Sequence, residues 1–235
     1  MLGILRTLLG GRPPAGPTVE LRARDCHCHV LPGVDDGSRD LAESRAMLQL
    51  LRAAGVRRVI ATPHVFPARF PNEPEALRPR FEALLAAVAD IPIELELGAE
   101  HYLDETLSDR IAGRRVLSFG PERYVLFEAL ASGPAPVDLM RTVQALADRG
   151  YTPLLAHVER YAWLRGPDRD ELAADLRAAG CRFQVNGTAD AGHGPRAAAL
   201  PWLRQHGWID EVGSDLHRAA PGGTTPHGGA APRRG

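Results

Sequence analysis

Short apolar runs alternate with longer segments of helical periodicity along most of this chain. The runs have the length of strands buried on both faces, whereas the longer segments repeat apolar residues every three or four positions. This alternation predicts repeated βαβ units and a parallel sheet. The predicted strands are Leu21–Asp25, Arg58–Ala61, Ile93–Ala99, Tyr124–Phe127, Pro153–Ala156, Arg182–Val185 and Ile209–Gly213. The predicted helices are Asp40–Ala54, Glu73–Val88, Asp104–Ala112, Val137–Asp148, Arg169–Ala179 and Ala197–Gln205.

We expect one barrel domain at residues 18–217, because about seven strand–helix units fill this range of a 235-residue chain. Residues 1–17 are predicted to form an N-terminal extension that ends in a Pro/Gly linker. Leucines at helical spacing favour a short helix over the base of the domain, with transient docking on a membrane or a partner as the alternative. Residues 218–235 are rich in Gly, Pro and Ala, which predicts a disordered tail.

Most of the apolar runs end at, or just before, a side chain that binds metal well. If the runs are parallel strands of one barrel, these side chains gather at the rim where the strands end, and that rim is where barrel enzymes place their chemistry. A single polynuclear metal site explains the pattern. The candidate ligands at the strand ends are His27, His29, His64, Glu100, Glu128, His157, Asp215 and His217.

The segment His27-x-His29 places both imidazoles on one face of an extended chain, since strand side chains alternate. Cys26 and Cys28 are then expected to face the packing layer on the other side. Core packing is the favoured interpretation of these cysteines, and zinc ligation is the alternative.

A turn-rich loop, Leu31–Gly37, follows this strand and offers a ninth ligand. Asp36 is the predicted ligand and Asp35 remains possible, while an Asx-turn is the structural alternative for either carboxylate. Nine donors are too many for one tetrahedral ion, so we expect two or three ions. Mixtures of His, Asp and Glu suit manganese, iron or zinc.

Glu100 and Glu128 end runs that should be buried, and a buried carboxylate is costly unless it meets a metal or a cation. A salt bridge to arginine is the alternative for each. Arg160, three residues after His157, is predicted to bind phosphate oxygens, with a salt bridge to Glu159 or another surface acid as the alternative. The remaining histidines are expected to lie away from the site, and they are His101, His193, His206 and His227.

Composition narrows the function classes. A net charge of −1 and a pI near 6.8 provide no bulk attraction to nucleic acid. All 28 basic residues are arginine, which excludes a lysine Schiff base, a Walker lysine and a carbamylated lysine bridge between metals. Three cysteines form no disulfide framework and indicate a reducing, cytoplasmic location. No apolar stretch approaches transmembrane length.

Five motifs resemble those of the polymerase-and-histidinol-phosphatase (PHP) superfamily, over about residues 18–217. Within it the chain is similar to the bacterial tyrosine-protein phosphatases of capsule and exopolysaccharide clusters. The resemblance implies a distorted, TIM-like (β/α)7 barrel with three metal ions, often Mn2+. The motifs are Asp25–Gly37, Ala61–His64, Gly98–Glu100, Leu155–Tyr161 and Gly213–His217.

The same resemblance implies a role for each candidate ligand. It matches Arg160 to the phosphate-binding arginine of the family. A second phosphate-binding arginine, usually found in a loop after the Asp-x-His pair, has no clear counterpart in the Gly/Pro-rich stretch here. The implied ligand sets are His27, His29, Glu100 and Asp215 for one ion, Glu100, Glu128 and His157 for a second, and Asp36, His64 and His217 for a third.

The leading hypothesis is hydrolysis of phosphotyrosine in a protein by a metal-activated hydroxide, with Arg160, His157 and Glu100 as the catalytic residues. No cysteine has an arginine six positions later, as cysteine-dependent tyrosine phosphatases require. The resemblance implies a membrane-associated bacterial tyrosine kinase of polysaccharide export as the substrate. The alternatives are a small-molecule phosphatase of the histidinol-phosphate type, a nucleotide phosphodiesterase, and a non-catalytic metal-binding protein, the last suggested by the irregular C-terminal sequence.

Overall fold

The computed structural model describes residue 21 and residues 23–187 and 199–219. The predicted N-terminal extension and all but the first two residues of the predicted tail lie outside the described residues, as do His193 and His227. The strands are β1 (Arg24–Cys28), β2 (Arg58–Ala61), β3 (His64–Val65), β4 (Glu94–Leu97), β5 (Glu100–Tyr102), β6 (Tyr124–Glu128), β7 (Thr152–Leu155), β8 (Arg182–Asn186) and β9 (Glu211–Gly213).

These strands are all parallel where they pair, and they close into a ring. β1 pairs with β2 and β2 with β4, while the second sheet has the order β3-β5-β6-β7-β8-β9. β2 continues into β3, and β4 into β5, after breaks of two residues. The ring closes where the Asp215 amide donates to the His27 carbonyl and the His29 amide to the Leu216 carbonyl. Seven strand positions result, so the predicted distorted (β/α)7 barrel is confirmed.

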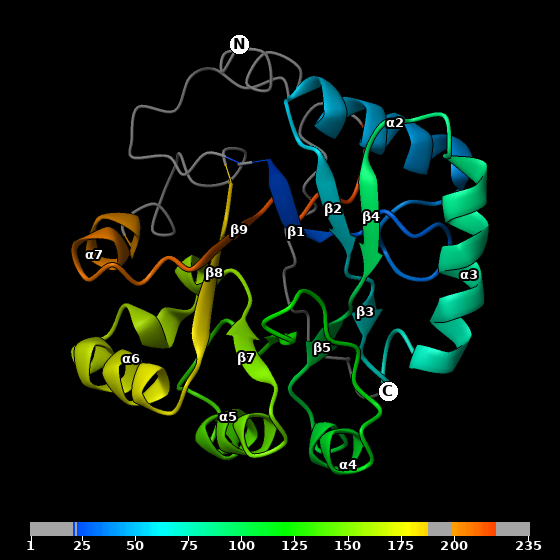
Figure 1. The fold of residues 1–235 in the computed structure, drawn as a ribbon. Helices are drawn as coiled ribbons and strands as arrows, with labels where there is room; N and C mark the ends of the chain where they lie inside the picture. The colour runs from blue at the N-terminus through cyan, green and yellow to red at the C-terminus, as the bar shows by residue number, and fades with distance from the viewer. Residues whose placement is uncertain (1–20, 22, 188–198, 220–235) are drawn as a thin grey trace, which may run out of the picture.

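The helices surround this ring on its outside (Figure 1). Every predicted helix is present, with ends that lie within a few residues of the prediction, and helix stops at Gly55, Gly150 and Gly180 have positive φ as a left-handed C-cap requires. None of the helices in the described ranges is long and apolar enough to span a membrane. The helices are α2 (Leu41–Ala53), α3 (Pro74–Ala87), α4 (Leu107–Ala112), α5 (Leu139–Ala147), α6 (Arg169–Ala178) and α7 (Ala199–Gln205).

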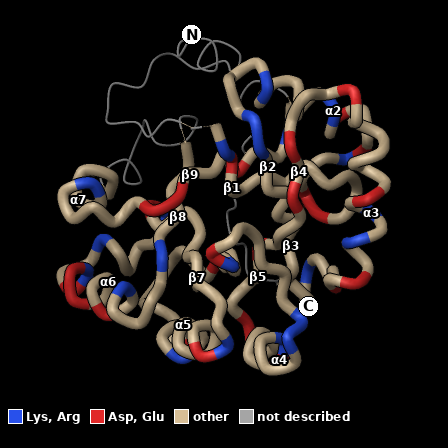
Figure 2. The backbone as a smooth tube through the Cα atoms, viewed as in Figure 1, with Lys and Arg blue, Asp and Glu red and all other residues tan. Residues whose placement is uncertain are grey.

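Charged residues are distributed over the outer helices and the connecting loops (Figure 2). Blue arginine and red acidic segments are interspersed in the view shown. This distribution agrees with the near-zero net charge of the sequence.

Two predicted strands were wrong in their extent. The Ile93–Ala99 prediction is too long, because β4 ends at Leu97 and β5 begins only at Glu100. Gly98 lies in this break, where a Cβ atom would lie 2.7 Å from a ring carbon of Phe119. β1 lies three residues later than predicted and contains His27. The donors His27, His64, Glu100 and Glu128 lie within strands, whereas His157 and Asp215 lie after the ends of β7 and β9.

The core consists of an outer layer between helices and strands and an inner cluster within the barrel. Cys26 and Cys28 are both buried, free thiols, as predicted. Their common orientation was predicted wrongly: Cys28 packs in the outer layer with α2, whereas Cys26 joins the inner cluster with Ile60 and Leu126. A shift of register between Asp25 and Cys28 accounts for this, because an extra residue in a strand breaks the alternation of side chains.

Candidate metal centre

The nine predicted donor side chains meet at one end of the barrel. They come from β1, the loop after it, β3, β5, β6 and the segments directly after β7 and β9. Eight of them are buried, and the Asp36 side chain is 19% exposed. The structure therefore brings together every donor that the sequence predicted, namely His27, His29, Asp36, His64, Glu100, Glu128, His157, Asp215 and His217.

One group of four donor atoms has the spacing of a single coordination sphere. The Nε2 atom of His27 lies 3.1 Å from the Nε2 atom of His29, 3.1 Å from Glu100 Oε2 and 3.4 Å from Asp215 Oδ1. The Nε2 atom of His29 lies 3.4 Å and 3.3 Å from the same two carboxylate oxygens. Four ligands placed 2.0–2.1 Å from a tetrahedral ion are about 3.3 Å apart, so this group fits one divalent cation.

The hydrogen bonds behind these rings fix their tautomers. Gln184 Oε1 lies 3.2 Å from Nδ1 of His27, and Asp35 Oδ2 lies 2.9 Å from Nδ1 of His29. Both oxygens accept, since Gln184 Oε1 also receives the His157 amide at 2.7 Å. Each neutral ring therefore carries its proton on Nδ1, and two Nε2 lone pairs face each other. Two facing lone pairs repel each other unless a proton or a metal ion lies between them, and these supporting bonds are typical of metal-binding histidines.

A second group surrounds the other side of Glu100. His157 Nε2 lies 3.0 Å from Glu100 Oε1 and 3.6 Å from Glu128 Oε2. His64 Nδ1 lies 3.2 Å from Glu100 Oε2 and 3.3 Å from Glu128 Oε1. Glu100 Oε1 thus faces His157, whereas Oε2 faces His27, His29 and His64. Both oxygens contact donors, as those of a carboxylate that bridges two ions would.

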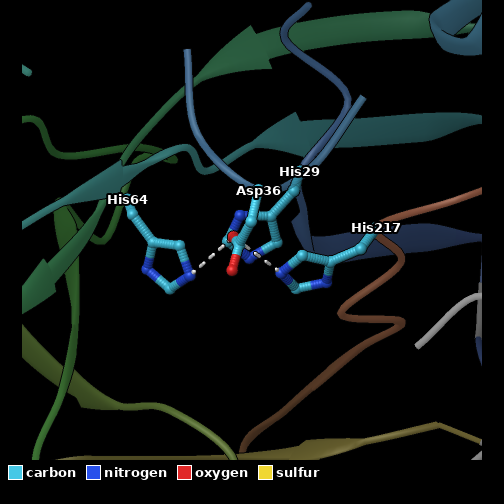
Figure 3. Close-up of side chains that lie close together, drawn as sticks. All are labelled: His29, Asp36, His64 and His217. Carbon is cyan, nitrogen blue, oxygen red and sulfur yellow. Dashed lines mark ion pairs between the residues drawn. The ribbon is translucent and has the colours of Figure 1, made fainter. Parts of the chain in front are cut away.

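A third group gathers around Asp36 (Figure 3). Asp36 Oδ1 lies 3.5 Å from His64 Nε2 and 3.4 Å from His217 Nε2. The His29 and His217 rings stack with centroids 3.9 Å apart. His64 therefore faces two groups with its two ring nitrogens, which the sequence did not indicate. Asp36 belongs to this group, whereas Asp35 lies behind the His29 ring.

The electrostatics of the groups favour a cation. Burial opposes ionisation of Glu100 and Asp215, yet the surrounding histidines and, for Asp215, the Arg160 guanidinium hold the pKa of both carboxyls well below its usual range. Burial disfavours a charged His64, but the Glu100 and Glu128 carboxylates together outweigh it and raise the pKa of His64 to about 9. Without metal, the carboxylates are ionised and protons occupy histidines, and divalent ions would replace those protons.

Three arginines lie near the groups. Arg160 is buried, and its Nη2 atom lies 2.6 Å from Asp215 Oδ2, so the alternative of a surface salt bridge is wrong. Arg69 is exposed, and its Nη2 atom lies 3.4 Å from Asp36 Oδ2. Arg218, the first residue of the predicted tail, donates to the carbonyls of Asp36, Gly37 and His217. The Arg218 guanidinium is held by these carbonyls and lies 4.0 Å from Glu43. Among the described residues, Arg69 is therefore the exposed arginine that reaches a donor side chain.

Two glycines allow close packing behind the His27-x-His29 segment. A Cβ atom on Gly213 would lie 2.3 Å from the His27 Cβ, and one on Gly37 would lie 2.3 Å from the His29 carbonyl oxygen. Any side chain at these positions would displace the histidines. The sequence signal was present, because each glycine lies within a few residues of a predicted ligand.

Two of the donors have a left-handed backbone. His157 has φ of 33° and Asp215 has φ of 52°, and each lies two residues after the last residue of a strand. This conformation is uncommon outside glycine and recurs at functional sites, where surrounding structure holds it in place. Here it turns the chain so that the side chain after the strand points back over the barrel.

The other described histidines lie away from the donor groups. His101 is buried on the opposite face of β5, and its Nε2 atom accepts the Leu117 amide at 3.2 Å. His206 is exposed and stacks on Trp208. Their placement agrees with the predictions.

Comparison with known proteins gives one family. The sequence model of the family described as "Capsular polysaccharide synthesis, CpsB/CapC" matches residues 23–226. Tyrosine-protein phosphatase YwqE of Bacillus subtilis (strain 168) is 32% identical over 197 residues, which are 82% of this chain and 76% of the relative. Tyrosine-protein phosphatase CpsB of Streptococcus pneumoniae is 26% identical over 69% of this chain and 66% of the relative.

The fold also matches a solved structure. It comes from the crystal structures of YwqE from Bacillus subtilis and CpsB from Streptococcus pneumoniae, described as unique metal-dependent tyrosine phosphatases. The TM-score is 0.76 at 30% identity, and the match covers 85% of this chain and 81% of that one.

Proposed function

Because the chain belongs to the capsular polysaccharide synthesis CpsB/CapC family, we propose that it is a metal-dependent tyrosine-protein phosphatase. Its relatives of known structure carry this activity, and the buried donor groups supply the chemistry that the activity needs. The observation that carries the proposal is the facing pair of Nε2 atoms of His27 and His29, 3.1 Å apart beside two carboxylates.

We assign the ligands according to the three groups. His27, His29, Glu100 and Asp215 would hold the first ion. Glu100, Glu128 and His157 would hold the second, with His64 in reach, and Asp36, His64 and His217 the third. Mn2+ is the proposed metal, and iron and zinc suit the same donors. Divalent ions, when bound, lower the pKa of a coordinated water and neutralise charge on a phosphate.

The proposed reaction is hydrolysis of the bond between phosphorus and the tyrosyl oxygen, and several residues of the chain position the groups that take part in it. Arg160, held beside Asp215, is placed to donate to phosphoryl oxygens as charge builds on them. Gln184 and Asp35 keep the two histidine rings in one tautomer and orientation. The dephosphorylated tyrosine side chain, still part of its protein, and inorganic phosphate are the products, and no covalent phosphoenzyme is required.

We further propose that the substrate is a phosphotyrosine protein of the capsule or exopolysaccharide system, with a membrane-associated bacterial tyrosine kinase as the specific partner. A tyrosine phosphatase requires a protein that carries phosphotyrosine as its substrate. A kinase that phosphorylates its own tyrosines is the simplest such protein. The free buried thiols agree with a cytoplasmic location.

The test is a comparison of two histidine variants loaded with Mn2+. His157→Ala should lower the turnover of a phosphotyrosine peptide by about 100-fold or more, since second-group ligands would be incomplete. His206→Ala removes an exposed histidine far from the groups and should leave turnover unchanged. Undiminished activity in His157→Ala would reject the assigned site. Histidinol phosphate and a dinucleotide ester, assayed in parallel, test the alternative substrates.

A further inference from the structure

An aromatic layer lies directly outside the donor groups. His64 and Glu100 are paired in register between β3 and β5. Two residues further along each chain, the rings of Phe66 and Tyr102 stack with centroids 4.0 Å apart and planes inclined by 15°. Because side chains alternate in extended chain, Phe66 and Tyr102 share the face of His64 and Glu100. They lie one step nearer the strand ends, level with Glu128, which pairs in register with Tyr102.

A tight turn adds a third ring to this layer. The Phe66 amide donates to the Phe70 carbonyl, and the Phe70 amide donates to the Phe66 carbonyl, which closes the turn on itself. The Phe70 ring consequently stacks on His64, with centroids 5.4 Å apart and planes inclined by 8°. The Arg69 guanidinium lies 4.8 Å over the Phe70 ring while it reaches Asp36.

The layer lies on the side from which a substrate must approach. Asp36 and Glu128 have the most exposed side chains among the nine donors, at 19% and 10%. The turn contacts Asp36 through Arg69, and Tyr102 neighbours Glu128. Phe66, Phe70 and Tyr102 are each half-buried, so they present ring surface to solvent beside these two carboxylates.

We propose that Phe66, Phe70 and Tyr102 form an aryl subsite that selects phosphate esters of aromatic alcohols over those of aliphatic alcohols. This inference rests on the proposed phosphatase function and names the residues that would give it tyrosine specificity. A phosphate at the donor groups directs its ester substituent outward, into this layer. An aromatic ring there gains stacking and apolar burial that a serine or threonine side chain does not provide.

Binding of two non-hydrolysable probes to the Mn2+-loaded full chain tests the subsite. Phenylphosphonate should bind about tenfold more tightly than methylphosphonate, as measured by calorimetry. Phe66→Leu and Tyr102→Leu should each reduce this ratio to about two- to threefold, and Tyr102→Phe should restore it because the ring is kept. Inorganic phosphate should bind all variants equally. Trp208→Leu, which removes a half-buried aromatic ring remote from the donors, is the matched control.

An unchanged ratio in both leucine variants, or equal binding of the two probes by the unmodified protein, would overturn the subsite. Loss of phosphate binding in the leucine variants would also overturn it, since the rings would then support the donor groups and not an aryl substituent. If the proposed phosphatase function is wrong but the aryl subsite exists, the measurements differ from these outcomes. In that case phosphotyrosine peptides are not hydrolysed, while the preference for phenylphosphonate and its dependence on Phe66 persist.

Discussion

Replacement of Asp35 by asparagine should weaken metal binding although Asp35 touches no proposed ion. The carboxylate accepts three hydrogen bonds, from His29 Nδ1 at 2.9 Å, from the His64 amide at 2.9 Å and from the Gly37 amide at 2.8 Å. Asparagine has one acceptor oxygen and an NH2 group, so whichever way the amide lies, at least one of these donors loses its partner.

The size of the effect follows from these bonds. A buried donor left without a partner costs about 1–3 kcal/mol of folding free energy. Removal of the charged acceptor behind a metal-binding imidazole lowers metal affinity by about 10–100-fold, or about 1.4–2.8 kcal/mol. Asp35→Asn should therefore lower both stability and Mn2+ affinity, and turnover should recover at saturating Mn2+ because the proposed ligands are all present.

Calorimetric titration of the chelator-treated protein with Mn2+ measures the affinity, and urea denaturation measures the stability. Asp40→Asn is the matched control, since Asp40 lies in the same region and caps α2 by accepting the Glu43 amide at 2.9 Å. Asparagine caps helices as well as aspartate does, so this variant should bind Mn2+ normally. Wild-type Mn2+ affinity in Asp35→Asn would refute the reasoning about the His29 tautomer.

Gly213→Ala should destabilise the protein by about 1–3 kcal/mol and reduce its metal content, because the new Cβ would overlap His27; elemental analysis that finds full metal content would contradict this. Arg160→Lys should lower kcat/KM for a phosphotyrosine peptide about tenfold or more at unchanged metal content, since an ammonium lacks the guanidinium fork; equal kcat/KM would count against a phosphate contact. Burial raises the pKa of Asp25 from 3.8 to about 6, so the folded protein keeps a proton that the unfolded chain releases. This stabilising contribution is complete below about pH 4 and is lost as the pH rises through 6, which lowers the free energy of unfolding by about 3 kcal/mol. Asp25→Asn should remove this pH dependence of the free energy of unfolding, as measured by urea denaturation. An identical pH dependence in the variant would exclude Asp25 as its source.

The strands and helices could be predicted because their signals are local. Apolar runs and helical periodicity depend on neighbouring residues, and parallel strands that close a barrel end at one rim. The sequence therefore also identified which side chains would meet there. Their role as metal ligands remains a prediction, whereas their proximity is a structural fact.

The supporting residues could not be predicted because their partners are distant in the chain. Gln184 contacts His27 across 157 positions, and its polar side chain in a buried strand was the only trace of that contact in the sequence. Arg69 lies near Asp36 because of the turn between Phe66 and Phe70, which no periodicity indicates. The choice between two adjacent aspartates depended on the same loop geometry.

The sequence alone thus determined the barrel class and the chemical identity of the donors, since both follow from residue order along single segments. The family resemblance implied a division of the donors into groups, but only the tertiary structure decided its geometry, in which His64 lies between two groups. That division depends on the register shift in β1, on the left-handed turns at His157 and Asp215, and on Gly213 packing against His27. Each of these is set by contacts between segments that the ring of strands brings together, and such contacts leave no pattern in either segment by itself.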